Sequence, residues 1–314
     1  MIVLPQERRT LGRTGMLVSP IGFGSSQLGG VRGGIDEAAG IEAVHEAFRS
    51  GINLFDTSPF YGLTRSEEVL GRAIADLPRR DIIVATKVGR YGETEFDFSA
   101  GRVTASVDES LRRLQLDYLD IVQCHEIELC EDVHQIISET LPALKTLKES
   151  GKVRAIGITG LPMWIYPYVL DRSKVELDLI LSYCHNCLND TTLRFLVPYF
   201  QVRGVGIVNA SALSMGLLTH SGGPAWHPAP EELKLAARRA AALCEERNAE
   251  LPRLALQYAL ADRDMDSTLV GIDSVKTLRS CLSAATEQID EGLLNDVLKI
   301  FEPVHNMTWR SGVL

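Results

Sequence analysis

Four ionisable side chains of this chain lie at, or just beyond, the ends of short apolar runs. INLFD ends at Asp56 and Tyr61 follows in the next loop, while DIIVATK ends at Lys87 and YLDIVQCH ends at His125. In a barrel of parallel strands, the C-terminal strand ends converge on one face, so these residues would meet there. A carboxylate, a phenol, an ammonium and an imidazole in one pocket can transfer protons. The pattern therefore predicts an enzyme.

Tyr61 is the candidate proton donor and acceptor of this group. A tyrosine has an unperturbed pKa of about 10, too high for catalysis at neutral pH, but a neighbouring ammonium lowers it. We expect Lys87 to supply that ammonium, Asp56 to keep Lys87 charged, and His125 to orient a substrate oxygen. Taken singly, each residue has a structural interpretation. Asp56 and Lys87 could be an ion pair, Tyr61 a loop aromatic, and His125 a buried histidine. Their coincidence at three successive strand ends favours catalysis.

Apolar runs alternate with helical patterns along the chain. The runs predict eight strands, at residues 21–24, 52–56, 82–86, 118–124, 153–158, 178–182, 205–210 and 267–272. This alternation indicates a parallel sheet, and we expect an α/β fold of the (β/α)8 TIM barrel type. A β-hairpin is predicted at residues 8–20 and a C-terminal extra helix at about 291–301. No linker rich in Pro, Gly or Ser divides the chain, so residues 1–314 are expected to form a single domain.

A doubly wound sheet is the competing architecture. Such sheets usually carry G-x-G-x-x-G after the first strand. Here the segment reads Gly22-Phe23-Gly24-Ser25-Ser26-Gln27, which lacks the third glycine, and no amphipathic helix follows at once. The barrel is therefore favoured.

Composition excludes several classes of function. The formal net charge is -9 and no basic stripe offsets it, so a nucleic-acid partner is not expected. No apolar stretch approaches membrane-spanning length, and the apolar run in the first residues, MIVLPQERRT, is too short for a signal peptide. We therefore predict a cytoplasmic protein with reduced thiols and no membrane partner.

Metal binding and Schiff-base chemistry are weaker interpretations of the sequence. Cys184 and Cys187 form a C-x-x-C pair, but no second pair or suitably spaced histidines accompany it, so no metal site is predicted. His125 begins like H-E-x-x-H, but position 129 is Leu. Lys87 alone could be a Schiff-base lysine of a barrel aldolase, a reading that leaves Tyr61 unexplained.

Small residues follow the seventh and eighth predicted strands. The loops after the last two strands of such barrels often bind phosphate, and a helix N-terminus favours negative charge. An anionic cofactor is one interpretation, and plain capping of the last barrel helix by Ser274 is the equal alternative. The candidate contacts are Ser211, Leu213, Gly216, Gly271 and Ser274.

These residues resemble the aldo-keto reductase superfamily. The segment from Asp56 to Gly62, DTSPFYG, is similar to its D-T-x-x-x-Y-G motif, and Lys87 and His125 match its other two catalytic positions. The resemblance covers almost the whole chain. It implies a (β/α)8 barrel, a nicotinamide cofactor bound without a Rossmann fold, and hydride transfer to or from a carbonyl carbon.

Longer segments are similar to the L-galactose dehydrogenase family of plants, among them FDTSPFYG, SVDESLRRLQLDYLDIVQCHEIE, ILSYCHNCLND and AWHPAP. This similarity implies an NAD-dependent aldose 1-dehydrogenase that oxidises C1 of L-galactose, or a related sugar, to the aldonolactone on the route to ascorbate. Tyr61 would be the general acid/base. The alternatives are an NADPH-linked aldehyde or ketone reductase, and a channel-associated subunit that binds cofactor but turns over slowly.

The resemblance also assigns cofactor positions. It implies nicotinamide or pyrophosphate contacts from Gly24, Ser25, Asp56, Thr159, Ser211, Leu213 and Gly216. At the last strand, Gly271 and Thr277 replace the lysine and arginine that grip a 2′-phosphate. Their loss favours NAD, because phosphate recognition relies on charge-assisted bonds; NADP stays possible with Lys276 and Arg279 nearby. Candidates for the wall of the sugar pocket, with surface packing as the equal alternative, are Phe60, Tyr91, Trp226 and Trp309.

Overall fold

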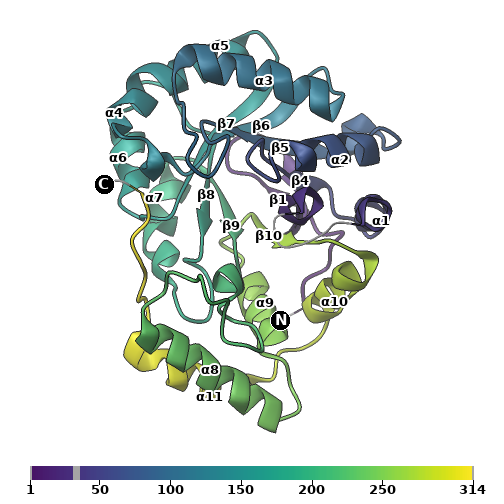
Figure 1. Cartoon of the computed structure of the whole chain (residues 1–314), viewed down its shortest axis with the longest axis vertical. Coiled ribbons are helices and arrows are strands. Elements are labelled where there is room, and N and C mark those ends of the chain that lie inside the picture. The colour runs from purple at the N-terminus through teal and green to yellow at the C-terminus, as the bar shows by residue number, and fades with distance from the viewer. Residues whose placement is uncertain (1, 31–35, 313–314) are drawn as a thin grey trace.

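The computed structural model describes residues 2–30 and 36–312, and its centre is a closed barrel of parallel strands (Figure 1). The order around the barrel is β10-β3-β4-β5-β6-β7-β8-β9, which confirms the predicted (β/α)8 fold over the doubly wound sheet. The barrel strands are β3 (Ile21–Gly24), β4 (Leu54–Asp56), β5 (Ile83–Val88), β6 (Leu119–Cys124), β7 (Val153–Gly160), β8 (Leu179–Tyr183), β9 (Gly206–Ala210) and β10 (Ser267–Gly271).

Helices surround the barrel (Figure 1). They are α1 (Glu37–Arg49), α2 (Arg65–Ile74), α3 (Ala100–Leu114), α4 (Val133–Gln135), α5 (Leu141–Glu149), α6 (Ile165–Arg172), α7 (Val197–Val202), α8 (Glu231–Glu246), α9 (Leu251–Ala261), α10 (Val275–Thr286) and α11 (Glu291–Phe301). Side-chain caps fix several starts. Asp36 accepts a hydrogen bond from the Ala39 amide at 3.1 Å, and Ser274 accepts one from the Thr277 amide at 3.2 Å.

One predicted helix is divided. The segment that ends at Glu149 begins as α4, widens into the π-helical turn Ile136–Thr140, and continues as α5. Pro142 lies in the first turn of α5. Because proline has no amide hydrogen, it fits only where the helix restarts.

The N-terminal hairpin closes the lower end of the barrel. β1 (Arg9–Thr10) pairs antiparallel with β2 (Leu17–Val18), as predicted. Leu11, Met16 and Val18 pack into one cluster with apolar residues of the barrel interior, such as Leu54 and Ile121. The barrel interior is therefore apolar at the end that the hairpin covers, and polar side chains collect at the opposite end, where the strands have their C-terminal residues.

A second apolar cluster lies beside the barrel, at the bottom of Figure 1. It joins α8 and α11 through buried residues that include Leu233, Ala237, Val297 and Phe301. α11 is the predicted extra helix, while α8 was not anticipated. After α11 the C-terminal segment, residues 305–312, runs along the molecule toward α6 and α7 (Figure 1). On its way the Asn306 amide donates to the Asn189 carbonyl at 2.9 Å.

No helix within residues 2–30 and 36–312 is both long enough and apolar enough to span a lipid bilayer.

The turn after Tyr61 depends on glycine. Gly62 has φ of +63°, and a Cβ added there would collide with the carbonyl of Gly29. We expect Gly62→Ala to lower the free energy of unfolding by about 2–4 kcal/mol, through backbone strain plus the collision. Gly15→Ala is the matched control, because Gly15 has φ of +72° but no atom within 4 Å of the added Cβ; it should cost about 1 kcal/mol. Urea unfolding checks both, and equal losses would show that the Gly29 contact is not limiting.

Candidate active site

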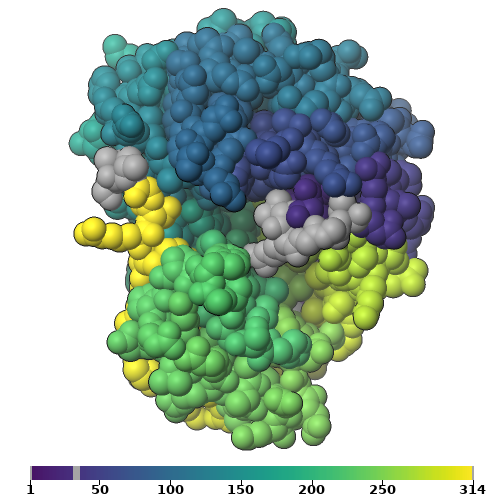
Figure 2. Space-filling model, in the orientation of Figure 1, coloured from purple at the N-terminus to yellow at the C-terminus, as the bar shows by residue number. Residues whose placement is uncertain are grey.

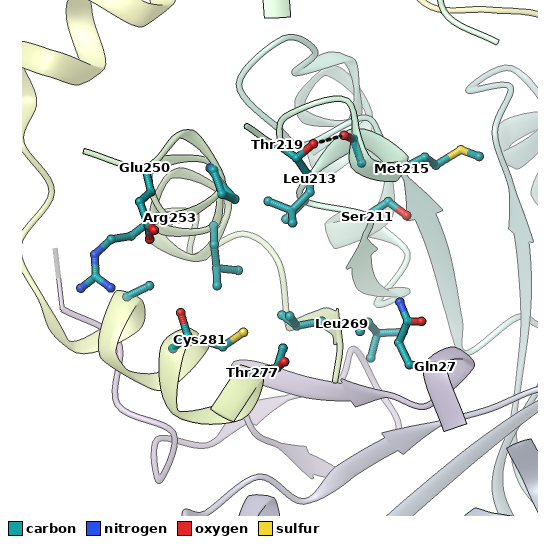
Figure 3. Close-up of a pocket in the computed structure, with 18 of the residues that line it drawn as sticks. Gln27, Ser211, Leu213, Met215, Thr219, Glu250, Arg253, Leu269, Thr277 and Cys281 are labelled. Atoms are coloured by element: carbon teal, nitrogen blue, oxygen red, sulfur yellow. Dashed lines mark hydrogen bonds between the residues drawn. The ribbon is translucent and has the colours of Figure 1, made fainter. Parts of the chain in front are cut away.

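Two connected cavities open at the C-terminal ends of the barrel strands. The inner cavity, of about 230 Å³, is lined by Asp56, Tyr61, Lys87 and His125 among others. The outer cavity, of about 410 Å³, lies between the loops after β9 and β10 and the helices α9 and α10 (Figure 3). Residues shared by both linings make the two spaces continuous: Ser26, Ser211, Met215, Leu269 and Gly271. In Figure 2 the surface is hollowed near the centre of this face, between the blue segments and the green loops.

A buried ion pair forms the floor of the inner cavity. Lys87 is 1% exposed, and its ammonium donates to an Asp56 carboxylate oxygen and to the Thr57 carbonyl, the latter at 2.8 Å. Gln123 donates to the other Asp56 oxygen at 3.2 Å. These side chains come from β4, β5 and β6, three adjacent strands in which Lys87 pairs in register with Gln123. The predicted convergence of separate strand ends is therefore present.

Tyr61 lies against this pair. The Lys87 ammonium is 4.8 Å from the centre of the Tyr61 ring, close enough for its charge to act on the Tyr61 hydroxyl. Burial nevertheless raises the pKa of Tyr61, more than Lys87 lowers it, and the charges of Asp56 and Glu126 raise it further. The expected net lowering is thus wrong, because removal from water disfavours the phenolate more than one ammonium, shared with Asp56, favours it.

Lys87 stays charged in this environment. Desolvation lowers the pKa of its ammonium, but the charge of Asp56, the phenol of Tyr61 and the hydrogen bonds to both raise the pKa above its ordinary value. A proton at this position is therefore held firmly. Lys87 can stabilise a phenolate at Tyr61 without becoming a proton donor itself.

His125 completes the polar wall as a neutral imidazole. Burial, followed by the charges of Lys87 and Arg90, lowers its pKa well below the usual value. The Phe60 amide donates to the Ser58 hydroxyl at 3.1 Å, so that hydroxyl can direct its own hydrogen to Nδ1 of His125, 3.1 Å away. This network leaves the hydrogen on Nε2, which can donate to a substrate oxygen.

Most of the candidate cofactor residues lie in the linings. Gly24, Asp56 and Thr159 line the inner cavity, Leu213 and Gly216 the outer one, and Ser211 and Gly271 both. Ser25 and Ser274 line neither cavity. Ser25 is fully buried, where its hydroxyl meets that of Ser66 at 2.8 Å, and Ser274 is engaged in capping α10. For Ser274 the capping alternative is thus the one that the structure supports.

The aromatic candidates for the sugar pocket are absent from the inner lining. Phe60 packs behind it, with its ring centre 5.9 Å from that of His125. Tyr91 is buried and accepts a hydrogen bond from the Gly89 amide at 3.1 Å. Trp226, which is 59% exposed, and Trp309 both pack against His227. The contacts described for these four side chains are packing contacts, and their place in the wall of the sugar pocket stays a prediction.

Sequence reasoning missed several lining residues. Tyr183 and Glu126 line the inner cavity, and Gln27, Thr219, Glu250 and Arg253 line the outer one. Figure 3 shows Glu250, just before α9, and Arg253 on α9, with Thr277 and Cys281 on the α10 side of the same space. The α9 residues belong to a helix whose contribution to the pocket depends on packing, so no local pattern marks them.

All six cysteines are free and buried, including Cys184 and Cys187. Burial raises the pKa of the Cys187 thiol to about 12, so this side chain is a poor nucleophile at neutral pH. Within the part of the chain that the structure describes, no group of three or more His, Cys, Asp and Glu side chains could hold a metal ion.

Removal of the buried ammonium should destabilise the fold. Lys87→Met leaves the Asp56 carboxylate buried without its cation, and we expect a loss of about 3–5 kcal/mol in the free energy of unfolding. The double variant Asp56→Asn/Lys87→Met should recover part of this loss, since no uncompensated charge remains. Lys174→Met, at an exposed lysine, is the control and should change little. Urea unfolding at neutral pH measures all three, and a wild-type value for Lys87→Met would refute the interpretation.

Known proteins are similar to this chain in sequence and in fold. A family model described as the aldo/keto reductase family matches residues 20–300. The L-galactose dehydrogenase of Arabidopsis thaliana is 53% identical over 314 residues, which cover 98% of both chains, and the D-arabinose 1-dehydrogenase of Saccharomyces cerevisiae is 34% identical over 87% of both. A solved aldo-keto reductase from Bacillus halodurans, in its holo form, has a TM-score of 0.77 at 27% identity and covers 98% of this chain and 99% of its own. Barrel, polar floor and sequence agree: the chain belongs to the aldo/keto reductase family, whose members are oxidoreductases that use nicotinamide cofactors.

Proposed function

We propose that this protein is an NAD-dependent aldose 1-dehydrogenase that oxidises C1 of L-galactose, or a related sugar, to the aldonolactone. The observation that carries the proposal is the inner cavity, where Tyr61, Lys87 and the neutral His125 surround a space of about 230 Å³. Two relatives, one named as an L-galactose dehydrogenase and the other as a D-arabinose 1-dehydrogenase, support a sugar as the substrate. The proposal includes a cytoplasmic location, a step in ascorbate biosynthesis, and one domain over residues 1–314.

The residues present fit a nicotinamide cofactor. The outer cavity continues directly from the catalytic residues, and its wall after β9 bends sharply, with positive φ at Ser211, Ser214, Met215 and Gly216. At the inner cavity, a Cβ added to Gly24 would lie 3.1 Å from the Val270 carbonyl oxygen, so the backbones of β3 and β10 are close-packed there. Ser26, Gln27, Ser211, Leu213 and Gly271 would hold the cofactor. When bound, its nicotinamide ring would accept the hydride from C1 of the sugar.

The side chains of the inner cavity have separate tasks in this reaction. Tyr61 removes the proton of the anomeric hydroxyl as the hydride leaves C1. The Lys87 ammonium, held by Asp56, stabilises the phenolate that precedes this step. His125 donates from Nε2 to the same sugar oxygen and fixes its direction, because its Nδ1 is engaged by Ser58.

The charges around the outer cavity support NAD over NADP. Arg253 lines this cavity, but it forms an ion pair with Glu287 and donates to the Ser283 hydroxyl at 3.2 Å. Arg279 is paired with Glu46 of α1 at 3.3 Å, and Lys276 is not in the lining. Among the described lining residues, a 2′-phosphate would therefore meet no uncommitted cation, while Glu250 adds a carboxylate.

One observation favours a second candidate, an NADPH-linked aldehyde or ketone reductase. The raised pKa of Tyr61 keeps its phenol protonated at neutral pH. A protonated phenol is the form that donates to a carbonyl oxygen during reduction. The same residues would then run the reaction in the opposite direction.

A panel of sugars with both cofactors tests the proposal. We expect NADH formation with L-galactose, slower turnover with L-fucose and D-arabinose, and weaker activity with NADP. Tyr61→Phe should lower kcat by about 10²–10⁴-fold, while the Kd of NAD, followed by quenching of intrinsic fluorescence, stays unchanged. No turnover with any aldose would refute the dehydrogenase, and faster reduction of carbonyl compounds with NADPH would favour the second candidate.

The pH dependence of kcat follows from the Tyr61 proton. Because oxidation needs the phenolate and the pKa of Tyr61 is raised, kcat at saturating sugar should climb about tenfold per pH unit across the neutral range. His125 should add no step between pH 6 and 8, since its pKa lies well below that window. Carbonyl reduction should instead be constant there and decline at high pH. A pH–rate profile in each direction checks this, and a fall in oxidation as pH rises would contradict it.

A further inference from the structure

Glu128 is a fully buried carboxylate that the proposed chemistry does not use. It lies in the short 3-10 turn Ile127–Leu129, just after β6, and is 0% exposed. Its Oε1 accepts three hydrogen bonds, from the Leu161 amide at 2.9 Å, the Tyr183 hydroxyl at 3.3 Å and the Ser311 hydroxyl at 3.0 Å. Three separate parts of the chain thus meet at one oxygen.

The second oxygen of Glu128 has no hydrogen-bond partner, although it is buried. It points at the backbone of Gly160, where an added Cβ would lie 2.9 Å from it. A bare, buried carboxylate oxygen is costly when charged, so it is the natural position for a proton. Burial, and then the charge of Glu126, raise the pKa of Glu128 to about 7.

Tyr183 connects this carboxylate to the inner cavity. Tyr183 lines the cavity, and its hydroxyl donates to Glu128 Oε1. The Tyr183 oxygen is therefore left as an acceptor, suited to a hydroxyl group of a ligand. Rotation or release of this hydroxyl would change the polarity of the wall.

The C-terminal segment, residues 305–312, is anchored at the same carboxylate. Besides the Ser311 bond, Gly312 adopts φ of +85° and packs so closely on the Glu128 backbone that a Cβ there would collide with the Glu128 carbonyl. In Figure 1 this segment runs from α11 up the left side of the molecule toward α6 and α7. Glu128 therefore ties the end of the chain to the wall of the cavity.

We propose that Glu128 is a positioning residue for the sugar: it holds the Tyr183 hydroxyl as an acceptor toward the pocket and clamps the C-terminal segment, and the clamp weakens when Glu128 ionises. The inference rests on the proposed function only for the nature of the ligand, a polyhydroxylated one. The clamp itself is a property of the chain without ligand.

The groups around Glu128 set the sign of the pH effect. Glu126, from the same loop and paired with Arg90, repels a second negative charge. Tyr166 of α6 and Tyr183 of β8 are neutral phenols, whose own pKa values burial raises. Ser311 of the C-terminal segment is uncharged. The hydrogen bonds from the Leu161 amide and the Ser311 hydroxyl favour the ionised form of Glu128, but burial and the charge of Glu126 outweigh them. Release of the segment into water therefore becomes more favourable as pH rises through about 7.

Hydrogen exchange followed by mass spectrometry tests the clamp without turnover. Since Glu128 has a pKa of about 7 when clamped and an ordinary value of about 4.3 when released, the opening constant of residues 305–312 should rise about tenfold from pH 6 to pH 8. Glu128→Gln keeps the shape but cannot ionise, so its opening constant should be independent of pH. Ser311→Ala should open the segment at both pH values. Glu302→Gln, an exposed carboxylate just after α11, is the control and should behave as wild type.

Kinetics test the effect on the sugar. In the wild type the KM for the sugar should rise between pH 6 and 8 while the KM for NAD does not. Glu128→Gln should remove this dependence, and Tyr183→Phe should raise the KM for the sugar about tenfold at all pH values. An unchanged pH dependence of exchange and KM in Glu128→Gln, or unchanged exchange in Ser311→Ala, would overturn the proposal. A wild type that oxidises no sugar would refute the dehydrogenase, yet the exchange experiment would still decide the clamp.

Discussion

The ion pair between Lys87 and Asp56 is the interaction on which the whole site depends. Each ion taken out of water costs several kcal/mol, and their attraction offsets this only where further hydrogen bonds satisfy both groups. Here the Thr57 carbonyl and the Gln123 amide supply those bonds from neighbouring strands. The register of β4, β5 and β6 is thus coupled to the charge of one ammonium. Tyr61 takes its position from that ammonium, and the sharp turn at Gly62 allows it to reach there.

Much of the architecture could be predicted from the sequence because the barrel repeats a simple pattern. Strands buried on both faces read as apolar runs, and caps such as Asp36 mark where helices begin. The elements that escaped prediction lack such local signals. α8 is stabilised by α11, which lies far along the chain, and the π-helical turn before Pro142 is a local deviation inside a regular helical pattern. The packing of α8 thus depends on residues that are distant in sequence.

For the site, the sequence located the four candidate catalytic residues because each ends or follows a strand. It located the cofactor pocket only in part, since α9 contributes Glu250 and Arg253 through packing. The electrostatics were predicted least well. Spacing indicates that Lys87 lies near Tyr61, but the pKa of Tyr61 depends on how far burial removes its hydroxyl from water. Here burial raises that pKa more than the charge of Lys87 lowers it. The same applies to Glu128, whose burial no motif indicated.

The pairing of Arg253 with Glu287 has a consequence for how cofactor choice can evolve in this barrel. The guanidinium already borders the outer cavity, so acquisition of phosphate recognition does not require a new basic residue. Loss of one acidic side chain on the opposite side of that arginine would liberate it. A change of coenzyme in a descendant of this chain could therefore arise at Glu287, a position outside the pocket, and would leave the lining itself unaltered.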